Sequence, residues 1–334
     1  MSERNQLFKV PKTRRFVSAW TVLHDEKRLL AQVGKYADLF DQLVLMCGAP
    51  TAAGKMPTSW PVKARRRLAA ELGQMNVSIL NDYGGGWQGC GEGFSRSPAK
   101  VAALARRMAD ECEATGADGV DIDFEKWPAE SRFAYTDFLA CLSEHLHARG
   151  KLLSICAYPY NAASRRETGI GFIDPSLVAP LVDQYRAMVY DLFCPPSQYV
   201  GPTSTAPWGR ECMNYLVAMI PRHKLIMGLP TYSVDWNIND PTQSRQVNDA
   251  AFIAAREKES PIGRGWCYFA DVNLIRYNDA AGHAHLVWVS DAMSTRSHLE
   301  TVEALDLTGI SFWVLDGAED VRIWQAVLEK FRRT

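Results

Sequence analysis

Eight short apolar runs, rich in β-branched residues, recur along the chain and alternate with longer segments of helical periodicity. The runs lie at residues 15–22, 42–47, 76–81, 119–125, 152–158, 187–191, 225–229 and 309–315. Strands that alternate with helices are typical of α/β proteins, whose strands are parallel. Eight such units favour a closed (β/α)8 TIM barrel over an open doubly wound sheet.

The segments between these runs support this fold class. Residues 100–115, 131–149 and 324–331 place apolar side chains three and four positions apart, as amphipathic helices do. A dinucleotide-binding fold would need a G-x-G-x-x-G motif after the first strand, and the sequence Ser18-Ala19-Trp20-Thr21 contains no glycine. The pattern therefore predicts a barrel without that cofactor site.

One connection is too long for a simple crossover. Residues 231–308 are about twice the usual length, and the segments 266–269, 277–285 and 286–289 read as strand, turn and strand. We predict one catalytic barrel domain over residues 1–334, with a small α+β insertion at residues 233–307 between the seventh and eighth strands. His283 and His285 lie on the predicted hairpin, where we expect them at the surface.

Composition excludes several classes of function. The chain has 334 residues, is 47% hydrophobic and has a formal net charge of −1. It can therefore bury a large core, and no overall charge favours nucleic acid as a partner. No run approaches the 18 apolar residues of a membrane span. The basic run of residues 65–67 is expected on the solvent face of a helix.

The cysteines and the first residues bear on the compartment. None of the eight cysteines forms a C-x-x-C pair, and residues 1–6 contain no apolar region of the kind that a secretory signal needs. Many cysteines without a signal fit a reducing compartment. We expect a cytoplasmic monomer, and export by a route without a signal peptide stays open.

The fourth apolar run has an acid at every second position. Because side chains alternate between the two faces of a strand, Asp121, Asp123 and Glu125 share one face, and apolar residues occupy the other. The apolar face should pack on helices, which leaves the acids in the barrel near the carboxyl ends of the strands, where barrel active sites lie. Three carboxyl groups so close together cannot all ionise cheaply, so we expect a shared proton and a general acid.

An acidic surface strand and a divalent-cation site are the alternatives for this run. A surface strand would not have so uniform an apolar face. Magnesium accepts carboxylate oxygens, but a metal site alone does not explain the motifs in later strands. We therefore predict a catalytic site without a metal or a cofactor.

The segment Asp118-Gly119-Val120-Asp121-Ile122-Asp123-Phe124-Glu125 resembles the D-G-x-D-x-D-x-E signature of glycoside hydrolase family 18, the chitinase-like hydrolases. Later motifs of the family follow in order, as M-x-Y-D at 188–191, G-x-P-x-Y at 228–232 and a strand ending in tryptophan at 309–313. Residues 285–294 are similar to the segment that closes the family's insertion. The likeness covers residues 15–331 and implies a TIM-barrel glycosidase.

The resemblance implies a role for each matching residue. Glu125 would protonate the glycosidic oxygen while the substrate's own 2-acetamido oxygen attacks the anomeric carbon, giving an oxazolinium ion and retention. Asp123 would hold the acetamido N–H and share a proton with Asp121, and Tyr190 would bind the acetamido oxygen. Trp313 would form the floor beneath the sugar. The substrate-binding candidates are Asp191, Met188, Trp313, Asp118, Trp20 and Tyr232.

Three departures from the family pattern concern substrate subsites. The glycines at 84–86 lie beyond the third strand, Lys126-Trp127-Pro128 follows the acid, and Thr231-Tyr232-Ser233 stands in the seventh-strand motif. They argue against crystalline chitin as the substrate. Tryptophans near strand ends or in loops are candidate sugar platforms, with core packing as the alternative for each: Trp20, Trp87, Trp127, Trp208 and Trp236.

The function predicted from these residues is hydrolysis of β-linked N-acetylglucosamine in an oligosaccharide or glycan. The enzyme would be a chitinase, a chitooligosaccharidase or an endo-β-N-acetylglucosaminidase. A non-catalytic lectin is one alternative, against which the presence of Glu125, Asp123 and Tyr190 argues. A barrel recruited to another reaction on a small cytosolic metabolite is the second, and the lack of an export signal keeps it open.

Overall fold

A computed structural model describes residues 14–22, 25–36, 38–46, 61–71, 76–78, 81–82, 97–125, 127–159, 171–197 and 199–332. Its main sheet is parallel, with the strand order β3-β2-β1-β14-β8-β7-β6-β5-β4. The strands are β1 (Phe16–Thr21), β2 (Gln42–Leu45), β3 (Asn76–Ser78), β4 (Asn81–Asp82), β5 (Gly119–Phe124), β6 (Leu152–Ala157), β7 (Gln184–Met188), β8 (Leu225–Pro230) and β14 (Gly309–Leu315).

Two short strands close this sheet into a ring. β3 pairs with β2, where Gln42 lies opposite Asn76, and β4 pairs with β5, where Asn81 lies opposite Asp123. β3 lies within the predicted third strand at residues 76–81, and β4 begins at its last residue and extends one residue further. The two short strands give the edges of the sheet their partners. The predicted eight-unit TIM barrel is therefore confirmed.

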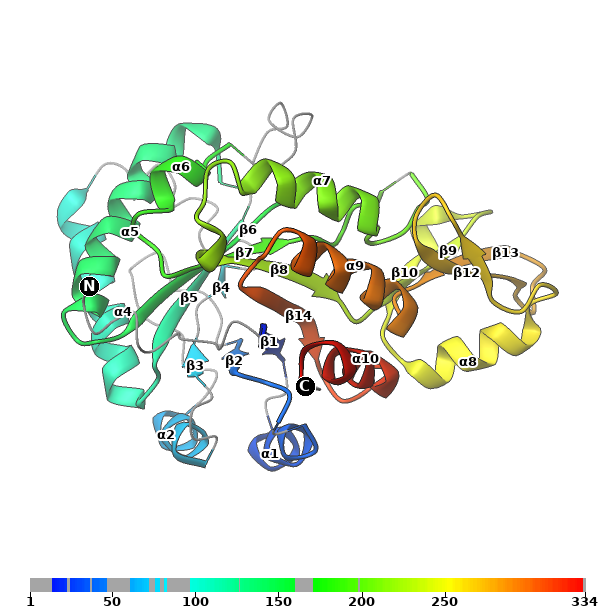
Figure 1. Ribbon diagram of the computed structural model, residues 1–334, viewed down its shortest axis with the longest axis horizontal. Coiled ribbons are helices and arrows are strands. Elements are labelled where there is room, and N and C mark those ends of the chain that lie inside the picture. The colour runs from blue at the N-terminus through cyan, green and yellow to red at the C-terminus, as the bar shows by residue number, and fades with distance from the viewer. Residues whose placement is uncertain are drawn as a thin grey trace.

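Helices surround the sheet (Figure 1). They are α1 (Glu26–Gly34), α2 (Val62–Glu71), α4 (Pro98–Thr115), α5 (Arg132–His147), α6 (Pro175–Val178), α7 (Ala206–Leu216), α9 (Ala292–Ala304) and α10 (Val321–Phe331), with 3-10 turns η2 (Ala129–Ser131) and η4 (Arg222–Lys224). Several begin at a residue whose side chain accepts a backbone N–H, as Asp25, Thr205 and Asp320 do. These caps fix where each helix leaves its loop.

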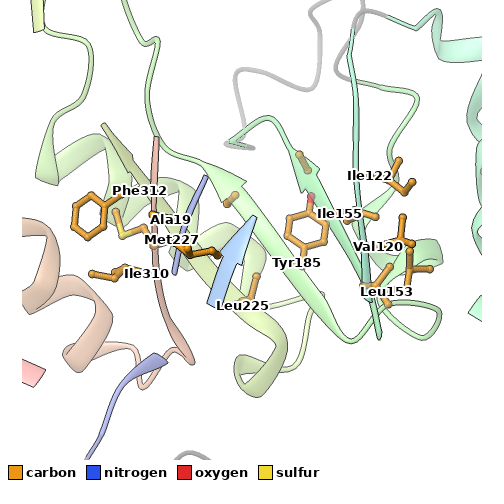
Figure 2. Close-up of a cluster of buried hydrophobic side chains, with 14 of the residues drawn as sticks. Ala19, Val120, Ile122, Leu153, Ile155, Tyr185, Leu225, Met227, Ile310 and Phe312 are labelled. Atoms are coloured by element: carbon orange, nitrogen blue, oxygen red, sulfur yellow. The ribbon is translucent and has the colours of Figure 1, made fainter. Parts of the chain in front are cut away.

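The main core lies between the strands and the helices. Figure 2 shows alternate residues of neighbouring strands in this layer, among them Val120 and Ile122 of β5 and Leu153 and Ile155 of β6. All four are buried. The residues between them on β5 and β6 must therefore face the barrel interior, because strand side chains alternate.

The insertion forms a second, antiparallel sheet with the order β10-β9-β13-β12-β11, which projects from one end of the barrel (Figure 1). It consists of β9 (Ser233–Asn237), η5 (Pro241–Gln243), β10 (Arg245–Val247), α8 (Ala250–Glu259), β11 (Gly265–Cys267), β12 (Val272–Asn278) and β13 (Ala284–Val289). It lies within the predicted range 233–307. The last part of that range is α9, whose Leu299 and Val302 belong to the barrel core.

Two surface predictions are wrong, and in both cases a charged partner explains the burial. His285 is buried because its Nδ1 lies 2.8 Å from Asp235 and 3.2 Å from the hydroxyl of Tyr277. Arg65 is buried because it pairs with Glu111 of α4, so only the other two arginines of the basic run face solvent. A buried charge needs such a partner.

The proposed sugar platforms also need correction. Trp127 is buried and stacks on Phe124, with ring centroids 5.1 Å apart. Trp236 is completely buried and donates its indole N–H to the carbonyl of Gly201 at 2.7 Å. Trp208 packs against the main core. These rings are packing residues, and Trp87 lies outside the described residues.

Among the described residues, no helix is long and apolar enough to cross a membrane.

Candidate active site

The acid face of β5 lies inside the barrel, as the alternation predicts. Asp121 and Asp123 are buried, and Glu125 follows the strand directly and is half-buried. Val120, Ile122 and Phe124, the residues between and before them, belong to the main core. The strand thus delivers three carboxyl groups to the interior, one above the other, ending at the carboxyl edge of the barrel.

Asp121 is held by four hydrogen-bond donors. Its Oδ1 accepts from the Ser154 hydroxyl and from Nε of Arg186, which lies 3.2 Å away. Its Oδ2 accepts from the Trp20 indole at 3.0 Å and from the Cys156 thiol at 3.2 Å. All four donors suit a carboxylate anion. The proton that we expect Asp121 to share with Asp123 stays a prediction.

Arg186 supplies the countercharge that sequence analysis missed. It is completely buried on β7, and Nη1 donates to Ser18 at 2.7 Å and to Ser311 at 3.1 Å. Nη2 donates to Gln184 at 2.6 Å and also to Gln42. One side chain therefore joins five strands of the barrel interior, namely β1, β2, β5, β7 and β14.

Cys156 is buried inside the barrel beside Asp121. Burial raises the pKa of its thiol well above the usual value, and the nearby charges of Asp121 and Asp123 raise it further. The group is therefore a neutral thiol that donates its proton to Asp121.

A cluster of aromatic and sulfur side chains lies beside the acids. Its buried members are Trp20, Val44, Cys156, Met188 and Tyr190, and Met46, Tyr158 and Trp313 pack against them. The rings of Trp20 and Trp313 meet edge-on with centroids 6.3 Å apart. Trp20 is buried and its N–H is bound to Asp121, so it supports Trp313 rather than offering a sugar platform of its own. Trp313 is half-buried.

Tyr190 and Tyr232 provide two uncharged donors. Their rings lie 6.4 Å apart, and burial raises the pKa of each phenol well above its usual value. Tyr232 donates to Oδ1 of Asp191, and the Thr203 hydroxyl lies 3.4 Å from the same oxygen. Asp191 has a left-handed backbone with φ 58, which turns the chain sharply after β7. The structure thus brings Met188, Tyr190, Asp191 and Tyr232 together.

Asp118 is the predicted site residue that the structure does not bring to this group. It precedes Gly119 at the amino end of β5, and its carbonyl accepts from Leu152 N at the start of β6. Burial raises the pKa of its carboxyl, while the charge of Lys151 opposes this. The residue lies at the opposite end of the strand from Glu125, so its predicted substrate-binding role conflicts with its position.

Tyr158, at the end of β6, is a second residue that sequence analysis missed. Its hydroxyl donates to Oε2 of Glu125. The signal was present in the chain, because Tyr158 ends a predicted strand beside the one that carries the acids. What was lacking was the register between the two strands.

Among the described residues, no three His, Cys, Asp or Glu side chains are placed to hold a metal ion together. The groups that donate hydrogen bonds to Asp121 and Glu125 are hydroxyl, thiol, indole and guanidinium groups. These groups bind the carboxyl oxygens without an intervening metal ion.

Comparison with known proteins identifies the family. The model of the glycosyl hydrolases family 18 matches residues 77–318, well over half of the chain. The chain belongs to this family. The prediction of a family 18 glycosidase is thereby confirmed at the level of the family.

Individual relatives agree with this assignment. The putative sporulation-specific glycosylase YdhD of Bacillus subtilis is 30% identical over 224 residues, which cover 66% of this chain and 52% of the relative. The cortical fragment-lytic enzyme of the same organism is 26% identical over 236 residues, which cover 68% and 53%. The chain thus spans about half the length of these curated relatives.

A solved structure shows the same fold. The chitinase from Chromobacterium violaceum superposes with a TM-score of 0.83 over 96% of this chain and 100% of that one, at 22% identity. At this identity the likeness supports the barrel architecture, including the insertion, and not a shared substrate.

Proposed function

We propose that this chain hydrolyses β-linked N-acetylglucosamine in oligosaccharides or glycans, with Glu125 as the proton donor. The observation that carries the proposal is the position of Glu125 and Asp123 at the carboxyl end of β5, next to the cluster that contains Tyr190 and Trp313. An acid, a second carboxyl group, an uncharged donor and an indole face are the groups that cleavage of an acetamido sugar needs.

The reaction proceeds in two steps. In the first, Glu125 gives its proton to the glycosidic oxygen, the bond from that oxygen to the anomeric carbon breaks, and the acetamido oxygen of the same sugar bonds to that carbon. Asp123 accepts the acetamido N–H and offsets the positive charge of the oxazolinium ion. In the second, Glu125 takes a proton from water, the water oxygen bonds to the anomeric carbon, and the bond from that carbon to the acetamido oxygen breaks. The sugar then leaves with its acetamido group restored and its configuration retained.

The tyrosines fix the acetamido group in this proposal. Tyr190 is buried against Met188 and keeps its phenolic proton, because its pKa is raised well above the usual value, chiefly by burial. It donates to the acetamido oxygen and directs that oxygen at the anomeric carbon. Tyr232 holds Asp191 at the edge of the same subsite. Trp313 carries the apolar face of the sugar.

The relatives decide which substrates are worth testing. One is named a chitinase, another a cortical fragment-lytic enzyme, and both chitin oligomers and bacterial wall glycans contain β-linked N-acetylglucosamine. Endo-β-N-acetylglucosaminidase activity on N-glycans stays within the same chemistry. Soluble oligomers are better first substrates than crystalline chitin, because the sequence departs from the family pattern in the seventh-strand motif that contains Tyr232.

The experiment incubates the wild type and Glu125→Gln with chitotetraose, chitohexaose, an N-glycopeptide and spore-cortex fragments, and measures new reducing ends. The wild type should cleave at least one substrate with retention, and Glu125→Gln should lose at least about a thousandfold of that rate, within the range for loss of acid catalysis. If all four substrates stay intact, the proposal fails.

Two other functions are outcomes of the same experiment. Binding of the oligomers without any cleavage would indicate a lectin. Neither binding nor cleavage would indicate a barrel used for another reaction. Tyr190, Asp123 and Glu125 are all present and grouped, which is why we favour hydrolysis.

A further inference from the structure

Hydrogen-bond donors line the strand next to the acids. β5 and β6 are parallel neighbours, with Asp121 opposite Ser154 and Ile122 opposite Ile155. The same offset places Glu125 opposite Tyr158, just beyond the last paired residues. Ser154, Cys156 and Tyr158 follow one another at every second position, so β6 presents a hydroxyl, a thiol and a phenol to the face that carries the carboxyl groups.

The contacts follow this register. Ser154 and Cys156 donate to Asp121, and Tyr158 donates to Oε2 of Glu125. Tyr158 and Glu125 are both half-buried, and the Tyr158 ring packs against the cluster that also receives Trp313. The phenol is therefore held between the acid and the aromatic cluster, and its hydroxyl donates to Oε2 of the acid.

This contact bears directly on the acid step. Tyr158 donates its phenol proton to Oε2 of Glu125, the residue that gives a proton to the glycosidic oxygen in the proposed function. As that proton leaves, Glu125 becomes an anion, and a hydrogen bond to an anion is about twice as strong as one to a neutral group. The Tyr158 contact thus strengthens during the step.

We propose that Tyr158 is a positioning residue that orients the Glu125 carboxyl group through its contact with Oε2 and stabilises the glutamate anion formed in bond cleavage. The inference rests on the proposed function, since it takes Glu125 as the acid. It extends that function by adding a residue whose contribution depends on how much protonation the leaving group needs. Interactions that strengthen in the transition state raise kcat rather than lower KM.

The test compares two leaving groups on one sugar chain in wild type and Tyr158→Phe. The substrates are a chitooligosaccharide, whose leaving group is a sugar hydroxyl, and its 2,4-dinitrophenyl glycoside, whose leaving group departs without a proton. We expect Tyr158→Phe to lower kcat about 10- to 100-fold for the sugar leaving group, the range for a hydrogen bond to a charged group. For the dinitrophenyl substrate the loss should be less than about threefold, and KM should change little for both.

The pH profile gives a second readout that a structural role would not change. Without the phenol proton, the Glu125 anion is less stable, so the alkaline limb of kcat/KM should move to higher pH in Tyr158→Phe. This limb is measured on the sugar substrate, and it remains informative even if the variant is somewhat less stable.

Tyr36→Phe is the matched control, because Tyr36 packs on Phe40 and Trp324 outside the barrel interior. It should leave both rates unchanged. An equal loss on both substrates, or an alkaline limb that does not move, overturns the inference about Tyr158. Glu125→Gln distinguishes a failure of the Tyr158 inference from a failure of the proposed function. If that variant cleaves the oligosaccharide at the wild-type rate, the assignment of Glu125 as the acid is wrong.

Discussion

Nε of Arg186 lies 3.2 Å from Oδ1 of Asp121, and both side chains are buried inside the barrel. An ion pair in such a place is held by its geometry, since each charge has lost water on burial. Here the remaining donors of Arg186 all find oxygen acceptors, in Ser18, Ser311, Gln42 and Gln184. The pair is therefore fully satisfied, and removing one partner leaves a charge without compensation.

Arg186→Met should lower the free energy of unfolding by about 3–5 kcal/mol, the cost of leaving a buried charge unpaired. Urea denaturation of the wild type and the variant measures this. Adding Asp121→Asn removes the orphaned charge, so the double variant should recover a large part of the loss.

The control for this prediction is Arg66→Met on the exposed face of α2, which should stay within about 0.5 kcal/mol of the wild type. A loss below about 1 kcal/mol in Arg186→Met would contradict the stabilising role of the buried pair.

Gly228→Ala should damage both folding and activity. A Cβ at Gly228 would lie 2.7 Å from the carbonyl oxygen of Ala187 and 3.1 Å from Cε1 of Tyr190. Because β7 and β8 are paired at this point, the backbone oxygen cannot move away easily, and overpacking costs about 1–3 kcal/mol. The displaced Tyr190 ring should lower kcat/KM on every cleaved substrate, measured in parallel with thermal unfolding.

Gly34→Ala is the matched control, because a Cβ at the end of α1 meets nothing within 4 Å. It should be neutral or stabilise by up to about 1 kcal/mol. Wild-type activity in Gly228→Ala would show that Tyr190 tolerates the extra methyl group.

Tyr232→Phe should raise KM with little change in kcat. The substitution removes the phenol that donates to Asp191 and leaves that carboxyl with Thr203. Loss of one hydrogen bond to a charged group corresponds to about a tenfold weaker interaction, here with the substrate that the proposed function places beside Asp191. Steady-state kinetics on the best oligosaccharide measures both constants.

Tyr277→Phe offers a matched change, since Tyr277 donates to Asp235 within the insertion. It should lower stability without raising KM. If Tyr232→Phe behaves in the same way, Tyr232 supports the fold and not the subsite.

His298 should make the protein less stable at acidic pH. It lies on the buried face of α9, and burial lowers the pKa of its ring from 6.5 to about 4. The unfolded chain takes up a proton near pH 6.5 while the folded protein does not, so stability falls as the pH drops from about 6.5 to about 4. A shift of this size corresponds to about 3 kcal/mol at the acidic end of that window.

His298→Gln keeps a side chain that can reach Ser204, the present partner of the ring, and it cannot be protonated. The difference in unfolding free energy between wild type and variant should therefore change by about 3 kcal/mol between pH 7 and pH 4. A difference that stays constant over this range would mean that His298 takes up its proton at the same pH in the folded and the unfolded protein.

The fold was predictable where apolar residues marked the strands. The predicted eighth strand at 309–315 coincides with β14, and 119–125 exceeds β5 by a single residue. The sixth prediction, 187–191, is wrong at both ends, because β7 spans Gln184–Met188. Gln184 and Arg186 face the polar interior, so they broke the apolar pattern, whereas the apolar residues after Met188 extended it past the end of the strand.

Within the site, residue types were predictable and partners were not. The acids of β5 could be assigned to one face from their spacing alone. That Tyr158 meets Glu125, or that Arg186 meets Asp121, depends on the register of β5 with β6 and on closure of the ring, which bring together residues 33 and 65 positions apart. The surface prediction for His285 was wrong for the same kind of reason, since its partner Asp235 lies 50 positions away in the sequence.

The contacts of Arg186 also bear on how such a barrel can change. The side chains that hold it come from strands encoded far apart, so a substitution at one of them is tolerated only together with others. The hydrogen bonds of Arg186 all go to residues within strands rather than to the loops at the carboxyl edge. Changes in substrate specificity should therefore arise by exchange of loops, while the residues that contact Arg186 inside the barrel stay the same. Loops from a relative can be grafted onto this barrel without changing the Arg186 contacts.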